Sequence, residues 1–99
     1  MKKHKDYEIW KSYVVPGFSD IMINQLAKHG DRGDSWKDEC TSWLLKRARE
    51  ELGEVETALN RLNAYSTIKQ RMKIVDRVAR ECADVANFMM MIADSVDAL

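Results

Sequence analysis

The sequence has little of what marks secreted, fibrous or membrane-inserted chains: its 99 residues include one proline, four glycines and two cysteines. Neither Cys40 nor Cys82 has a cysteine or histidine neighbour at metal-ligand spacing, so reduced, buried thiols are expected rather than a disulfide scaffold or a zinc site. The longest apolar run, residues 85–93, is interrupted by Asn87 and is too short to span a membrane. We therefore expect a cytoplasmic protein that contacts no membrane.

The chain also lacks net charge, because 16 basic and 16 acidic side chains balance to zero. Without a field of one sign, general binding to nucleic acid is disfavoured. A single domain of this size buries only roughly 60% of its unfolded surface when it folds alone. Association with further copies is therefore expected to complete the core.

Apolar residues recur at steps of three and four along most of the chain, which is the period of helices. We expect a single all-α domain over residues 1–99, an antiparallel helical bundle completed by oligomerisation. Turn residues mark an extended or frayed N-terminal arm over residues 1–17, which ends in Pro16 and Gly17. Capping residues then divide the rest of the chain into three helices. The first runs from Ser19 to Gly30, the second from Ser35 to about Asn63, and the third from a Thr67–Gln70 capping box to Val96.

Two pairs of acidic residues stand three apart, Glu51 with Glu54 and Glu81 with Asp84. Such pairs are common on solvated helix faces, and each pair alone is simply surface. Glu51, however, lies on the apolar stripe of its helix, and Asp84 enters a stretch that is apolar on nearly every side. We predict that the four carboxylates converge on a narrow site that needs a hard cation, Mg²⁺ or Mn²⁺.

The positions of these pairs along the two helices do not match completely. Glu54 and Glu81 lie about 13 and 21 Å from the expected turn at 1.5 Å per residue. They become level only if residues 60–70 form a longer irregular connection or if the helices cross obliquely.

The two acidic segments resemble motifs of a known family. Glu50, Glu51, Leu52, Gly53 and Glu54, followed by Glu81, Cys82, Ala83 and Asp84, are similar to the EExxE and ExxD motifs of the MazG-like all-α nucleoside triphosphate pyrophosphohydrolases. The resemblance covers the two long helices, more than half of the chain. It implies Mg²⁺-dependent hydrolysis of a nucleoside triphosphate, of a deoxy or damaged nucleotide in particular, to a monophosphate and pyrophosphate. It also implies four metal ligands, Glu51, Glu54, Glu81 and Asp84, while Glu50 is either an outer group or the base that orients water.

Further residues are candidate contacts to the substrate. The resemblance implies that Asn87 binds the sugar or phosphate, and the alternative is a core amide bonded to another helix. Arg32 and Trp36 belong to a basic, aromatic segment that can clamp a phosphate or stack on a base. Lys73 is one of five basic residues of the third helix that could reach phosphates, the others being Lys69, Arg71, Arg77 and Arg80. Arg77 with Glu81 and Arg80 with Asp84 are more simply interpreted as ion pairs one turn apart.

Two other functions compete with this interpretation. A non-enzymatic protein whose methionine-rich third helix docks on a partner would explain the methionines but not Glu51 on an apolar stripe. A phosphoribosyl-ATP pyrophosphohydrolase would share the fold and the acidic pattern. In those enzymes an aromatic residue followed by histidine commonly comes after the second motif, whereas Phe88 is followed by Met89 here. The expected partners are a nucleoside triphosphate and further copies of the chain, in a homodimer or homotetramer.

Overall fold

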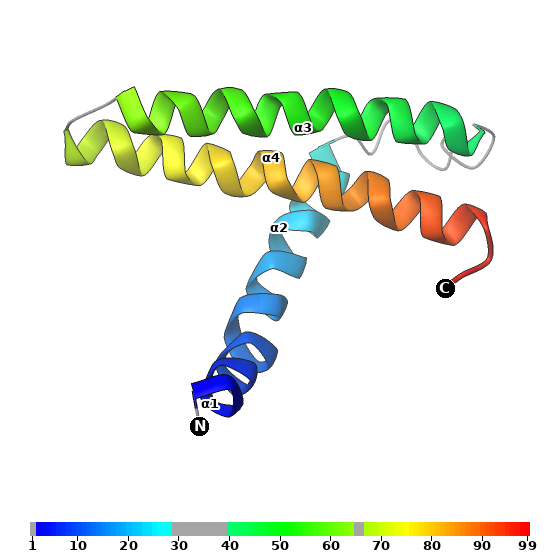
Figure 1. Ribbon diagram of the computed structural model, residues 1–99, viewed down its shortest axis with the longest axis horizontal. Helices are drawn as coiled ribbons and strands as arrows, with labels where there is room; N and C mark the ends of the chain where they lie inside the picture. The colour runs from blue at the N-terminus through cyan, green and yellow to red at the C-terminus, as the bar shows by residue number, and fades with distance from the viewer. Residues whose placement is uncertain (1, 29–39, 65–66) are drawn as a thin grey trace.

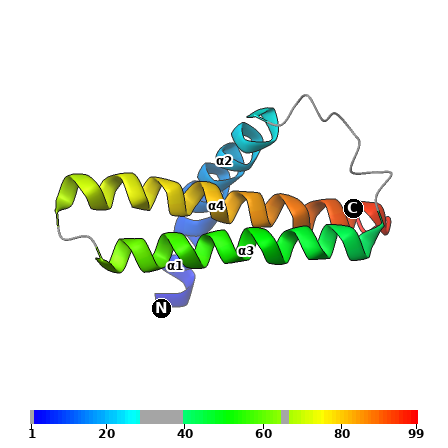
Figure 2. The ribbon, with the colours of Figure 1, turned by 90° about the horizontal axis from the view of Figure 1, so that it is seen from above.

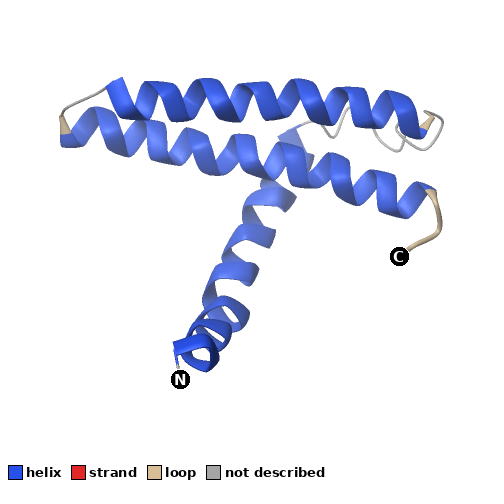
Figure 3. Cartoon of the chain, in the orientation of Figure 1, coloured by secondary structure: helices blue, strands red, loops and turns tan. Residues whose placement is uncertain are grey.

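The structure, a computed structural model, describes residues 2–28, 40–64 and 67–99, and every regular element in these ranges is a helix (Figures 1 and 3). The elements are α1 (Lys2–Ile9), the π-helical turn η1 (Trp10–Val14), α2 (Val15–Lys28), α3 (Thr41–Ala64) and α4 (Ile68–Ser95). The expected all-α class is confirmed.

The two long helices α3 and α4 form an antiparallel hairpin, and α2 packs across α4, with its projecting part on the side away from α3 (Figure 1). Four residues of α3 are buried against α4, at steps of three, four and seven that keep them on one helix face. Ala83 completes the core from α4, the α3 residues being Leu44, Ala48, Val55 and Ala58. The predicted apolar stripe of the second helix is therefore the hairpin interface.

The hairpin connection is shorter than the sequence analysis allowed for. α3 ends at Ala64, one residue beyond the predicted Asn63, and α4 begins at Ile68. The Thr67 hydroxyl oxygen accepts the Gln70 backbone N–H at 3.3 Å, as a helix N-cap does. The Thr67 hydroxyl in turn donates to the Gln70 Oε1 at 2.7 Å. In a complete capping box this side chain would accept the Thr67 backbone N–H instead, so the predicted capping box forms in part.

The prediction of an extended or frayed arm over residues 1–17 is wrong, because residues 2–28 are helical throughout. Pro16 lies in the first turn of α2 and follows the π-helical turn, in which the Val15 N–H donates to the Trp10 carbonyl five residues back. A wider turn of this kind accommodates a residue that cannot donate to the helical ladder. Ser19 consequently lies inside α2 rather than at its start.

The sequence also yields predictions for the cysteines, for two helix boundaries and for membrane spans. Both cysteines are free thiols, but Cys40 is exposed because it stands just before α3, where its carbonyl accepts the Trp43 and Leu44 N–H groups. The predicted helix boundaries at Gly30 and Ser35 lie outside the described residues. Within the described ranges, no helix has both the length and the apolar character that a bilayer span requires.

The molecule is extended for its size. Its radius of gyration is 15.7 Å, against about 13 Å for a compact domain of this length. The excess arises because α2 crosses α4 steeply, so that α1, η1 and the beginning of α2 project away from the hairpin (Figures 1 and 2). The packed part of the molecule is therefore the hairpin together with the second half of α2.

Candidate metal centre

The short connection places the two acidic motifs opposite each other. Glu51 lies thirteen residues before the end of α3, and Glu81 lies thirteen residues after the start of α4. Each is therefore about 20 Å from the turn along its helix. Glu54 and Glu81 are not level because Glu54 lies three residues nearer the turn than Glu51.

Three carboxylates meet at this level, and we call them the acidic cluster: Glu51, Glu81 and Asp84. One oxygen atom from each lies within 4.8 Å of the other two. The side chains of Glu51 and Glu81 are each 18% exposed, so water is largely excluded from them. Three like charges in such a place repel one another strongly, which makes the cluster a candidate cation site.

Glu54 does not belong to the acidic cluster, although the sequence analysis placed it there. Its side chain is 54% exposed and its Oε2 lies 3.5 Å from the Arg77 Nη2. It stands almost one helical turn nearer the hairpin connection than Glu51, and this brings it level with Arg77 on α4. The structure therefore assembles three of the four predicted carboxylates.

Two arginines bracket the acidic cluster. One guanidinium nitrogen of Arg47 donates a hydrogen bond to Glu50, and the other donates to the Glu51 Oε1 at 3.2 Å. Its guanidinium also lies over the Phe88 ring, 5.4 Å from the ring centre. On the other side Arg77 pairs with Glu81, Nε to Oε1, at 3.6 Å. The predicted Arg77–Glu81 pair is thus confirmed.

The other predicted pair of this kind, Arg80 with Asp84, is wrong. Arg80 turns toward the preceding turn of α4 and pairs with Asp76 at 3.4 Å. Asp84 is engaged instead from a third helix, because the Gln25 Nε2 donates to its Oδ1 at 3.0 Å. Gln25 is 7% exposed. Gln25 is not among the residues predicted from the sequence; the signal that could have found it is a polar residue on the apolar face of α2.

Asn87 forms the bond to another helix that the sequence analysis offered as its alternative. Its Nδ2 donates to the Met22 carbonyl of α2 at 3.1 Å, and the residue is 4% exposed. Its Oδ1 is buried without a hydrogen-bond partner among the described residues. A buried acceptor in that condition costs about 1–3 kcal/mol. Asn87 therefore holds α2 and keeps an acceptor free one turn beyond Asp84.

Of the remaining predicted site residues, Glu50 and Lys73 lie within the described ranges, and neither belongs to the acidic cluster. Glu50 is about half exposed and is held by Arg47 at the rim of the site. Lys73 is exposed on α4, eight residues and about 12 Å before Glu81. Arg32 and Trp36 lie outside the described residues.

The negative charge of the cluster affects the pKa of Glu51. Burial raises the pKa of its carboxyl group above the ordinary 4.5, and the nearby Asp84 and Glu81 raise it further, while Arg47 acts in the opposite direction. A carboxyl group in this condition binds either a proton or a cation more readily than one on the surface. The arrangement is therefore suited to a ligand that supplies positive charge.

No protein-family model matches the chain, and no curated protein or solved structure matches it significantly. The function is therefore inferred from the residues of the site and from their geometry.

Proposed function

We propose that this chain is a Mg²⁺-dependent nucleoside triphosphate pyrophosphohydrolase of the MazG-like kind. The observation that carries the proposal is the approach of three carboxylates, from two antiparallel helices, to within 4.8 Å of one another. Oxygen donors alone favour a hard cation such as Mg²⁺, with Mn²⁺ as an alternative. The raised pKa of Glu51 supports the same conclusion, since the cluster needs positive charge.

In this proposal Glu51, Glu81 and Asp84 hold the cation, and Glu54 joins them from the same helix face as Glu51. Glu54 needs only to exchange its contact with Arg77, because side chains three apart on a helix have Cβ atoms about 5–6 Å apart. When bound, the cation neutralises phosphate oxygens and lowers the pKa of the attacking water. Gln25 orients Asp84 through its hydrogen bond and thereby ties α2 to the site.

The two bracketing arginines suit a triphosphate. Arg47 and Arg77 form ion pairs with carboxylates on either side of the cluster. A guanidinium group binds phosphate in the same two-pronged geometry in which it binds carboxylate. Glu50, at the exposed rim and within reach of Arg47, is the proposed base that orients water. Asn87 supports the site from behind, because its hydrogen bond to the Met22 carbonyl holds α2 beside the cluster.

The remaining parts of the proposal concern the nucleotide and the assembly. Lys73, Arg32 and Trp36 are proposed to contact the nucleotide, which we propose to be a deoxy or damaged one. The products are a nucleoside monophosphate and pyrophosphate. We further propose that the enzyme acts in the cytoplasm as a homodimer or homotetramer.

The test is release of pyrophosphate from a panel of standard, deoxy and modified nucleoside triphosphates, with Mg²⁺ and with excess EDTA. We expect release from at least one substrate with Mg²⁺ and none with EDTA. Phosphoribosyl-ATP belongs in the panel because its hydrolysis alone would favour the related pyrophosphohydrolase activity. Silence across the panel from a folded sample would exclude the proposed enzyme.

A second candidate function is a non-enzymatic helical interaction protein. The observation in its favour is the number of exposed apolar side chains, among them Met72 and Trp10. This function does not require the acidic cluster, so replacing Glu81 should leave partner binding intact. The pyrophosphate assay separates the two functions directly.

A further inference from the structure

Arg77 forms ion pairs with both long helices of the hairpin. Its Nη2 lies 3.5 Å from the Glu54 Oε2 on α3, and its Nε lies 3.6 Å from the Glu81 Oε1 on its own helix. Glu81 belongs to the acidic cluster, whereas Glu54 is the predicted ligand that the structure leaves outside it. Arg77 therefore connects the cluster to its missing fourth carboxylate.

Both contacts of Arg77 are loose. The N–O distance in a charge-assisted hydrogen bond is about 2.7–2.9 Å, and Arg47 comes closer to that range, at 3.2 Å from the Glu51 Oε1. Glu54 is also 54% exposed, and water weakens an ion pair in such a position. Arg77 is thus shared between two carboxylates without a close bond to either, so a stronger partner can displace both.

A triphosphate is a stronger partner for this guanidinium group. Phosphate groups offer pairs of charged oxygens that match the guanidinium fork. The Arg77 side chain is 27% exposed, so an anion can reach it from the solvent. In the proposed function the phosphates meet the cation beside Glu81, the residue with which Arg77 pairs. They therefore arrive within reach of Arg77.

The departure of Arg77 changes the surroundings of Glu54. Glu54 and Glu51 are three residues apart on α3, with Cβ atoms about 5–6 Å apart. While Arg77 stays in place, its guanidinium holds the Glu54 carboxylate outside the acidic cluster. Once that contact is lost, Glu54 can turn toward a cation held by the cluster. Release of Arg77 thereby adds a fourth carboxylate to the other three.

We infer that Arg77 is a latch, a residue that couples the binding of the triphosphate to the completion of the cation site. Without the triphosphate, Arg77 holds Glu54 and Glu81, and three carboxylates face the cation. When the triphosphate binds, Arg77 moves to its oxygens and Glu54 becomes the fourth ligand. The cation and the triphosphate consequently raise each other's affinity, because coupling between two sites is reciprocal. The inference rests on the proposed function and describes the regulation of its site.

The first test is the affinity for Mn²⁺ without any phosphate, measured by isothermal titration calorimetry. Arg77→Met removes the latch but keeps an apolar stem of similar length, and it should bind Mn²⁺ about tenfold more tightly than the wild type. The matched control is Arg80→Met, which also removes a positive charge from α4, but one that pairs with Asp76. Its effect should be much smaller, since salt screens exposed charges. Equal affinities for the two variants would overturn the latch.

The second test asks whether the gain in affinity depends on Glu54. Glu54→Gln alone should change Mn²⁺ binding little, because Arg77 already holds this carboxylate. In the Arg77→Met background the same substitution should remove most of the gain, while Glu56→Gln, at an exposed position of α3, should not. A gain that survives the loss of Glu54 would mean that Arg77 acts through its charge alone, which contradicts the latch. Circular dichroism checks that the helices of every variant are intact.

The third test supplies the phosphates. The α,β-methylene analogues of the standard deoxynucleoside triphosphates cannot be cleaved between the α and β phosphates, and each is titrated into protein with saturating Mg²⁺. Arg77→Met should weaken the binding of an analogue about tenfold or more, as the loss of a charged hydrogen-bond partner does. Arg80→Met should leave it nearly unchanged. Equal binding by the two variants would exclude the transfer of Arg77 to the phosphates.

The latch and the enzyme can fail separately. Suppose that the chain hydrolyses a nucleotide but binds Mn²⁺ equally well with and without Arg77. The latch is then wrong and the enzyme stands. If instead the Arg77 and Glu54 variants bind Mn²⁺ as expected but the wild type releases no pyrophosphate, the enzyme is wrong and the coupling of Arg77 to the cation site stands.

Discussion

The middle of the hairpin and the first half of α4 reverse the usual distribution of polarity. In the middle, the carboxylates of Glu51 and Glu81 are largely removed from water between α3 and α4. In the first half of α4, Ile68 and Met72 stand in water. Both arrangements are unfavourable for an isolated chain, because one concentrates like charges and the other exposes apolar surface. The comparison indicates two different missing ligands, a cation for the first region and a protein surface for the second.

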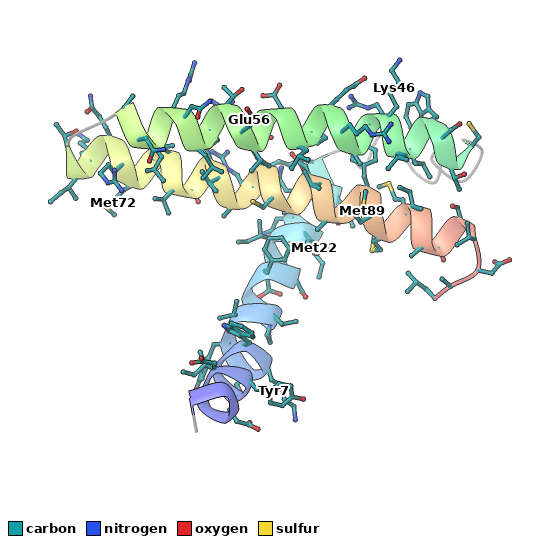
Figure 4. All side chains as sticks on the ribbon, viewed as in Figure 1. Tyr7, Met22, Lys46, Glu56, Met72 and Met89 are labelled. Atoms are coloured by element: carbon teal, nitrogen blue, oxygen red, sulfur yellow. The ribbon has the colours of Figure 1, made fainter. Side chains whose placement is uncertain are left out.

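The largest expected effect concerns the hairpin middle. Glu81→Gln should reduce Mg²⁺-dependent pyrophosphate release by about a thousandfold or more, which corresponds to about 4 kcal/mol of transition-state stabilisation. The control is Glu56→Gln, which removes an exposed carboxylate from the same hairpin (Figure 4). Equal rates for the two variants would show that the half-buried acidic cluster has no role in turnover.

The next effect tests whether the hairpin interface carries the stability of the fold. Leu44→Ala should lower the free energy of unfolding by about 2–5 kcal/mol, because Leu44 is completely buried. Leu52→Ala, on the exposed side of α3, should change it by less than about 1 kcal/mol. Urea unfolding followed by circular dichroism measures both. Similar losses for the two variants would mean that α3 is covered on its outer face as well.

A smaller effect is expected where α2 joins the cluster. Gln25→Leu removes the donor to Asp84 and should cost about 1–2 kcal/mol of stability in the metal-free protein. Added Mg²⁺ should recover part of this loss, since the cation then compensates Asp84. Thermal unfolding with Mg²⁺ and with EDTA gives the comparison. Identical losses under the two conditions would separate Gln25 from the cation site.

The smallest effect is a pH dependence at Glu51. Because its pKa is raised in the folded protein above the ordinary 4.5, folding favours the protonated form. The contribution of Glu51 to stability is therefore complete below the ordinary pKa and is lost as the pH rises through the raised pKa. In EDTA, Glu51→Gln should become more stable relative to the wild type across that window. A difference in Tm that stays constant from pH 4 to 8 would contradict the proposed repulsion.

The two long helices were predictable because their determinants are local. The steps of apolar residues marked the interface of α3 from Leu44 to Ala58, and the Thr67 hydroxyl marked the start of α4 to the residue. The N-terminal helix was missed for the opposite reason. Pro16 and Gly17 are breakers when judged by propensity alone, and a π-helical turn before them removes the conflict.

The acidic cluster was predictable in kind but not in membership. Glu51 on an apolar stripe indicated a buried carboxylate, and its proximity to Glu81 and Asp84 followed from the hairpin. The place of Glu54 depended on a register of three to four residues, which the length of the connection decides. Gln25 and Arg47 were missed because their importance lies in contacts that no spacing within one helix reveals.

The sequence by itself determined the two long helices, the start of α4 after Thr67 and the presence of carboxylates beside apolar faces, since periodicity and capping act between neighbours in the chain. Only the tertiary structure decided which carboxylates meet, which arginines face them, and that α2 crosses α4 steeply and leaves half of each helix uncovered. Those outcomes depend on the register and crossing of packed helices, which side chains far apart in the sequence settle together.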